Sequence, residues 1–136
     1  MREDGRMRHE RLEYCVWWGT KRSSIKRRRG SDTAPDPAEL LLGAVGTCLS
    51  IGYVLNAAEL QRVALDLEGD IDLSVFAGLA EEGTPGYSDI RVRAQIKSNA
   101  PADVIRALHE HVIRTSRICS TVARPVNVTS EVVLSG

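Results

Sequence analysis

Residues 36–58, DPAELLLGAVGTCLSIGYVLNAA, contain the longest uncharged stretch of the chain and predict its principal helix. Asp36 fits the N-cap, Pro37 the first helical position and Glu39 the third, an arrangement that resembles a capping box. The capping pattern explains Glu39 without assigning it any chemistry. We expect the helix to run from Pro37 to about Leu60.

The uncharged stretch from Leu40 to Ala58 is near the lower length limit for a transmembrane helix. Glycine, threonine, serine and asparagine dilute its hydrophobicity, and the rest of the chain alternates like a soluble sheet protein. We therefore favour a helix that is buried all round and no membrane partner, with a membrane-associated subunit as an alternative. Small residues four positions apart, Gly43/Thr47 and Gly46/Ser50, predict close packing against another helix or a sheet, or across a dimer.

The length and charge of the chain restrict the classes of protein to which it can belong. Its 136 residues predict a single domain, 1–136, and its 4% aromatic content predicts an aliphatic core. Eighteen basic and eighteen acidic residues cancel, which argues against a nucleic-acid partner. Residues 1–30 form a basic N-terminal strand region with a net charge of +6, and the remainder carries −6.

Alternating apolar residues predict strands over 11–18, 63–73, 87–97 and 126–134, with a possible polar strand over 21–28. A second helix should follow Pro101, with His109 and His111 exposed to solvent away from its apolar stripe. Acidic residues of 63–73 beside basic residues of 87–97 predict cross-strand pairs. The predicted order is β(β)αββαβ, which is the α+β class.

Three cysteines are too few, and odd in number, for a secreted disulfide framework. No Cys-x-x-Cys occurs and the histidines make no zinc spacing with the cysteines, so we expect no metal and no cofactor. The charged N-terminus holds no signal-peptide apolar region, which favours the cytoplasm.

The thiols are the best candidates for chemistry. Cys48 lies in the middle of the uncharged helix. Ser116 is placed to cap a short helical segment over 116–122, which puts Cys119 near a helix N-terminus, where backbone amides favour a thiolate. Cys15 lies in a predicted strand and is interpreted as structural. Cys48 and Cys119 are candidates for a peroxidatic and a resolving thiol if they meet in space.

Three blocks of the sequence resemble the OsmC/Ohr family in the same order. They are the helix block PAELLLGAVGTCL from Pro37, the strand block PGYSDIRVRAQIKS from Pro85, and TSRIC from Thr115 followed by RPVNV. The resemblance covers about residues 31–134. It implies an OsmC-like fold in which antiparallel sheets pack around a long central helix in an intertwined homodimer.

The resemblance also implies a thiol-dependent peroxidase that reduces organic hydroperoxides. By position, Cys48 would be the peroxidatic cysteine, oxidised to a sulfenic acid, and Cys119 would resolve it as a disulfide. A dithiol reductant would reopen that disulfide, and an apolar pocket would favour organic hydroperoxides over hydrogen peroxide. The alternative is a non-enzymatic OsmC-like dimeric module that binds an apolar small molecule or senses redox state.

Departures from the family pattern concern the groups that support the thiol. The peroxidase members have glutamate directly after the helix-start proline, whereas this chain has Ala38 there and Glu39 one residue later. They also hold the thiolate with an arginine from the N-terminal sheet, for which Arg29 is a candidate beside Arg22, Arg27 and Arg28. Ser120 replaces the proline that commonly follows the resolving cysteine. A guanidinium beside the Cys48 sulfur would favour the peroxidase, and purely apolar surroundings would favour the binding module.

Overall fold

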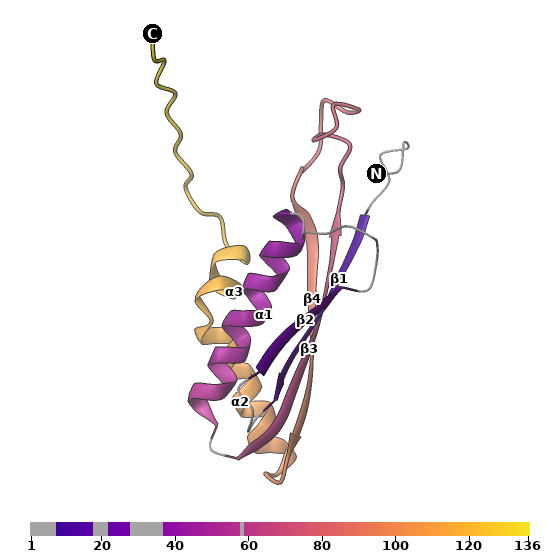
Figure 1. Ribbon diagram of the computed structural model, residues 1–136, viewed down its shortest axis with the longest axis vertical. Coiled ribbons are helices and arrows are strands. Elements are labelled where there is room, and N and C mark those ends of the chain that lie inside the picture. Colours follow the sequence, from indigo (N-terminus) through magenta and orange to yellow (C-terminus); the bar gives the residue numbers. More distant parts are fainter. Residues whose placement is uncertain (1–7, 18–21, 28–36, 58) are drawn as a thin grey trace.

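The computed structural model describes residues 8–17, 22–27, 37–57 and 59–136, with side chains from Pro37 onward. Four strands form one antiparallel sheet in the order β2-β1-β3-β4. Three helices lie on one side of this sheet, so the body has two layers (Figure 1). The elements in chain order are β1 (Arg8–Trp17), β2 (Arg22–Arg27), α1 (Pro37–Asn56), β3 (Leu60–Ile71), β4 (Tyr87–Ser98), α2 (Ala102–Thr115) and α3 (Arg117–Val122).

The sheet confirms the possible polar strand, which spans Arg22–Arg27, and the predicted pairing of the two alternating segments that form β3 and β4. Every second residue of β3 from Val63 to Ile71 is buried, because these side chains face the helices. The corresponding residues of β4 are only partly buried, and those between them are exposed. β3 therefore supplies most of the sheet's contribution to the core, and β4 is a half-covered edge strand.

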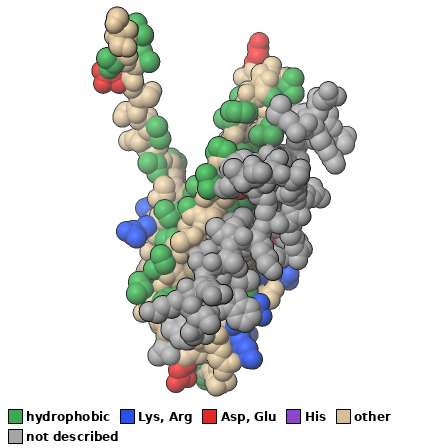
Figure 2. Space-filling view, viewed as in Figure 1, with side chains coloured by type: hydrophobic (Ala, Val, Ile, Leu, Met, Phe, Trp, Pro, Cys, Tyr) green, Lys and Arg blue, Asp and Glu red, His purple; other side chains and the backbone are tan. Residues whose placement is uncertain are grey.

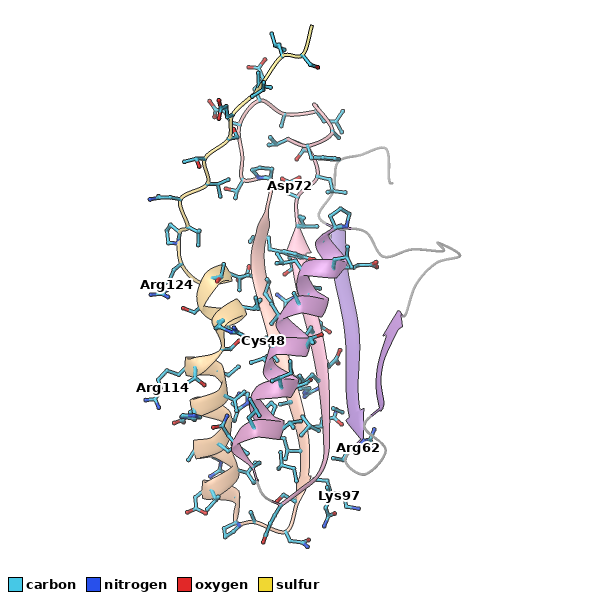
Figure 3. All side chains as sticks on the ribbon, turned by 60° about the vertical axis from the view of Figure 1, so that its left-hand side comes forward. Cys48, Arg62, Asp72, Lys97, Arg114 and Arg124 are labelled. Atoms are coloured by element: carbon cyan, nitrogen blue, oxygen red, sulfur yellow. The ribbon has the colours of Figure 1, made fainter. Side chains whose placement is uncertain are left out.

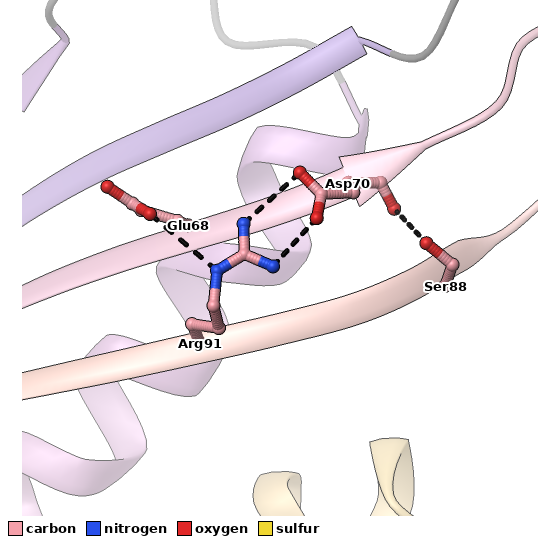
Figure 4. Close-up of polar contacts among 4 residues, drawn as sticks. All are labelled: Glu68, Asp70, Ser88 and Arg91. Carbon is pink, nitrogen blue, oxygen red and sulfur yellow. Dashed lines mark hydrogen bonds and ion pairs between the residues drawn. The ribbon is translucent and has the colours of Figure 1, made fainter.

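The outer face of the sheet carries the predicted cross-strand ion pairs (Figure 4). Arg91 on β4 donates from Nη1 to Asp70 Oδ2 at 2.7 Å and from Nη2 to Asp70 Oδ1 at 3.1 Å. Its Nε lies 3.7 Å from Glu68 Oε2. Exposed pairs of this kind contribute at most about 1 kcal/mol each, so they help to fix register more than stability.

α1 covers the inner face of the sheet with one side. Leu42, Val45, Leu49 and Tyr53 on that side are at most 1% exposed and form the centre of the core. Its first turn is held to β4, because the Tyr87 hydroxyl donates to the Ala38 carbonyl oxygen at 2.8 Å. The Tyr87 ring crosses Gly69 of β3, where a Cβ atom would overlap the ring.

α1 is shorter than the sequence predicted. It ends at Asn56 rather than near Leu60, because Leu60 is buried as the first residue of β3. The predicted cap Asp36 lies outside the described residues. By length and composition alone α1 could cross a membrane. The core helix of a soluble protein passes the same test, so this feature does not indicate a membrane protein.

α2 packs against α1 at a glycine. A Cβ atom at Gly52 would lie 2.9 Å from Val112 Cγ1, so a larger residue there would require the Val112 side chain or the helices to shift. Val112 is buried, whereas Val104 of the predicted apolar stripe is exposed. The close approach at Gly52 sets the distance between the two helices and thereby places the start of α3 against α1.

The predicted strand over 126–134 is wrong for this structure. These residues make no strand pairing within the described chain, and they extend away from the body as a tail (Figure 1). Val128 and Leu134 are 88% and 89% exposed. Alternation makes a segment suited to a sheet, but a strand also needs a neighbouring strand to pair with, and within the described residues this segment pairs with none.

Candidate functional site

Cys48 lies midway along α1, on the side that faces α3 (Figure 3). The Ser116 hydroxyl donates a hydrogen bond to Cys48 Sγ at 3.2 Å. Ser116 is itself buried, and its oxygen accepts from the Cys119 backbone N–H at 3.2 Å. One serine therefore caps α3, as predicted, and also contacts the thiol of Cys48.

The surroundings of Cys48 favour its ionised form. Burial raises the pKa of the thiol, but the Ser116 hydroxyl, the backbone N–H groups of Ile118 and Arg117, and the positive charge of Arg117 all lower it. The net result is a pKa below the ordinary cysteine value. Donors aimed at sulfur stabilise a thiolate, which is the nucleophilic form.

Cys119 lies in the third position of α3 and packs partly buried against the core. Both Cys48 and Cys119 are free thiols. Ser116 contacts both the Cys48 sulfur and the Cys119 backbone N–H, so the structure brings the backbone of Cys119 close to Cys48, although the two residues are 71 positions apart in the chain.

The other predicted residues are placed differently. Glu39 is buried on the side of α1 that holds Leu42 and Gly43. Nine residues are about two and a half helical turns, so Glu39 and Cys48 point to opposite sides of α1. Arg29 lies outside the described residues, and so does the side chain of Cys15. Among the described residues, the positive charge that lowers the pKa of Cys48 is that of Arg117.

His109 was predicted to face solvent, and that prediction is wrong. It is partly buried, its ring stacks on Tyr53 with centroids 6.1 Å apart, and its Nδ1 is hydrogen-bonded to the Tyr53 hydroxyl. Burial, with the negative charge of Cys119, raises the pKa of Tyr53 to about 12. The sequence held no local signal of this contact, because Tyr53 and His109 are 56 positions apart.

The side of α1 opposite the sheet is apolar and exposed. Hydrophobic side chains run in a row over α1 in Figure 2, beside others on the tail. Cys48 borders this face, so the surroundings of the thiol combine polar donors with open apolar surface. Within the described residues, no group of three or more His, Cys, Asp or Glu side chains is arranged to hold a metal ion. The exposed face comprises Leu40, Leu41, Ile51, Val54 and Leu55.

Comparison with known proteins gives one family. A family model described as OsmC-like protein matches residues 30–131, which is most of the chain and includes both thiols. None of the curated proteins matches the chain.

Proposed function

The chain belongs to the OsmC-like protein family, and from that premise we propose that it is a thiol-dependent peroxidase that reduces organic hydroperoxides. The observation that carries the proposal is the Cys48 thiol, held by the Ser116 hydroxyl at 3.2 Å with a lowered pKa beside a second free thiol, Cys119. We also propose the cytoplasm as its compartment, where free thiols persist.

In the first step the Cys48 thiolate attacks the outer oxygen of a hydroperoxide, ROOH. A sulfur–oxygen bond forms, the O–O bond breaks, and the alkoxide leaves as an alcohol after gaining a proton. Cys48 becomes a sulfenic acid and the peroxide is reduced by two electrons. The Ser116 hydroxyl and the amides of residues 117 and 118 orient the thiolate, and the charge of Arg117 assists them.

In the second step the Cys119 thiolate attacks the Cys48 sulfenic acid. The S–O bond breaks, a disulfide forms and water is released. A dithiol reductant then restores both thiols by thiol–disulfide exchange, and is itself oxidised to a disulfide. The apolar surface beside Cys48 suits the organic part of the hydroperoxide.

We propose that the working form is a homodimer. The exposed face of α1 presents Leu40, Ile51 and Leu55 to solvent, and β4 leaves the inner sheet half covered. A second copy would cover this face and enclose Cys48 in apolar surroundings. Light scattering at micromolar concentration should give twice the 14.9 kDa chain mass. Leu55→Glu should give the monomer, whereas a monomeric wild type would contradict the proposal.

A non-enzymatic dimeric module that binds an apolar ligand or senses redox state is the second candidate. The observation in its favour is Ala38, a methyl group where the peroxidase members carry a carboxylate. Such a sensor would still be oxidised at Cys48 but would not reduce hydroperoxide over repeated cycles.

The test is turnover of an organic hydroperoxide, such as cumene hydroperoxide, with a dithiol as reductant. Wild type should consume both in equal amounts over many cycles, and Cys48→Ser should lose the activity. Cys15→Ser is the matched control, because Cys15 belongs to β1, where it pairs with Ala64 of β3, and not to α1 or α3. Oxidation of Cys48 once per chain without turnover would favour the sensor, and no reaction of Cys48 would contradict both redox functions.

A further inference from the structure

The C-terminal tail, residues 126–134, has the pattern of a strand but pairs with none among the described residues. In an extended chain every second residue lies on the same face. One face of the tail is therefore mainly apolar and fully open to solvent, with Val126, Val128, Val132 and Leu134. The other face is mainly polar, with Asn127, Thr129 and Glu131. Such a segment suits the edge of a sheet that is covered on one side only.

β4 is an edge strand with the same pattern. In the order β2-β1-β3-β4 it pairs with β3 alone among the described residues. Such an edge can accept a further strand, because its outer backbone groups are not used in a ladder. The other edge strand, β2, has six residues, of which only Ile25 is apolar, whereas β4 has twelve. The inward positions of β4 are apolar and only partly buried: Ile90, Val92, Ala94 and Ile96.

A shallow hollow lies beside β4 on the inner side of the sheet. Ala94 and Ile96 line it from β4, and Ile105 lines it from α2. These three apolar side chains are only partly buried, so the contact between β4 and α2 is incomplete within one chain. The apolar face of an added strand would cover them and continue the inner layer of the sheet.

The charges of the tail and of β4 are complementary on the outer side of the sheet. When the apolar face of the tail points inward, Glu131 lies on the outer face in either direction of the strand. The charged outward positions of β4 are Asp89, Arg91, Arg93 and Lys97, so positive charge predominates there. Opposite charges on neighbouring strands are favourable, whereas a tail beside a second tail would place two Glu131 side chains together.

We propose that the tail of one chain adds as a strand to the free edge of β4 in a second copy, and that the second copy returns the same contact. This inference rests on the homodimer proposed above and names the segment that joins its two chains. The tail leaves α3 and extends away from the sheet of its own chain (Figure 1). Because α3 contacts α1 at Cys48, a second copy on the exposed face of α1 lies next to the start of the tail. The tail spans about 30 Å when extended.

Substitutions in the tail test the proposal without disturbing the body of the chain, since Val128 is 88% exposed there. Val128→Asp puts a charge on the apolar face and should raise the dissociation constant of the dimer at least about 10-fold in analytical ultracentrifugation. Thr129→Asp is the matched control, because it puts the same charge at the next position, on the face that meets the basic residues of β4. Its dissociation constant should stay close to that of wild type. An unchanged constant in Val128→Asp would contradict the added strand.

Isotope labelling identifies the chain that receives the tail. Dimers are formed from equal amounts of labelled and unlabelled full-length chains, and filtered nuclear Overhauser spectra record only contacts between the two. Methyl groups of the tail valines in one chain should contact Ala94 and Ile96 of the other. The same contacts within the chain of monomeric Leu55→Glu would mean that a chain's own β4 receives its tail, which would overturn the proposal. A wild-type dimer whose tail does not contact β4 would overturn it while the homodimer stands, and a monomeric wild type would overturn both.

Discussion

The two sides of α1 have similar apolar composition, but one is buried and the other is exposed to solvent. The side with Leu42, Val45 and Leu49 is sealed against the sheet, whereas the side with Ile51 and Leu55 is open to solvent. Cys48 lies between them, where α3 reaches the helix. One helix thus supplies both a core and an exposed apolar surface, and its reactive thiol stands at their border.

This difference explains why α1 has no charged residue after Glu39 although half of its surface is open. A surface helix normally carries charges on its outer side. Apolar residues on both sides are expected when both sides are covered in the working protein, which is the physical basis of the proposed homodimer. The following predictions test the contrast between the sealed side and the open side.

Leu49→Ala on the sealed side should cause the largest loss in the free energy of unfolding. Leu49 is fully buried, and truncation of such a side chain costs about 2–5 kcal/mol of the free energy of unfolding. Ile51→Ala on the open side is the matched comparison. Urea unfolding at several protein concentrations should show a concentration-independent loss for Leu49→Ala and a concentration-dependent loss for Ile51→Ala. Equal, concentration-independent losses would remove the distinction between the two sides.

Tyr53, at the sealed side, should make the fold sensitive to alkali. Its pKa is raised to about 12, while a phenol in the unfolded chain titrates near 10. Its contribution is therefore complete below about pH 10 and is lost as the pH rises towards 12, by up to about 3 kcal/mol. Free energies of unfolding measured from pH 8 to 12 should fall less steeply in Tyr53→Phe. Parallel curves for the two proteins would show that the phenol is not buried as described.

Ser116→Ala tests the border between the two sides. Loss of the hydroxyl that donates to Cys48 should raise the pKa of that thiol, so its alkylation at pH 7 should become several-fold slower. Ser116→Thr should restore most of the rate. The Ala variant also loses the α3 cap, at about 1 kcal/mol. Alkylation that follows the same pH curve in all three proteins would contradict the contact.

Tyr87→Phe should have the smallest effect. It removes the hydrogen bond to the Ala38 carbonyl oxygen but keeps the ring over Gly69, so the loss should be about 1 kcal/mol. Gly69→Ala should reduce stability more, because its Cβ atom would displace the Tyr87 ring. Thermal unfolding should rank wild type, Tyr87→Phe and Gly69→Ala in that order of stability, and the reverse order of the two variants would show that the ring is placed differently.

Local patterns in the sequence predicted the parts that depend on neighbours in the chain. Alternation located β3 and β4, and Ser116 was correctly placed as the cap of α3. What could not be predicted are contacts between distant residues: the Ser116 hydroxyl on Cys48, and His109 on Tyr53. The segment 126–134 shows the same limit, since its valines favour a strand but its local sequence does not decide whether it finds a strand to pair with.

The unpaired tail has a consequence for the solubility of the protein. Residues 126–134 are rich in valine, exposed and free of proline, which is the composition of segments that add to sheet edges of other molecules and aggregate. Glu131 is the single charge after Arg124, and it interrupts the run immediately before Val132. Glu131 therefore acts as a gatekeeper: its negative charge disfavours stacking of identical tails, and concentrated Glu131→Gln protein should be more prone to aggregate than wild type.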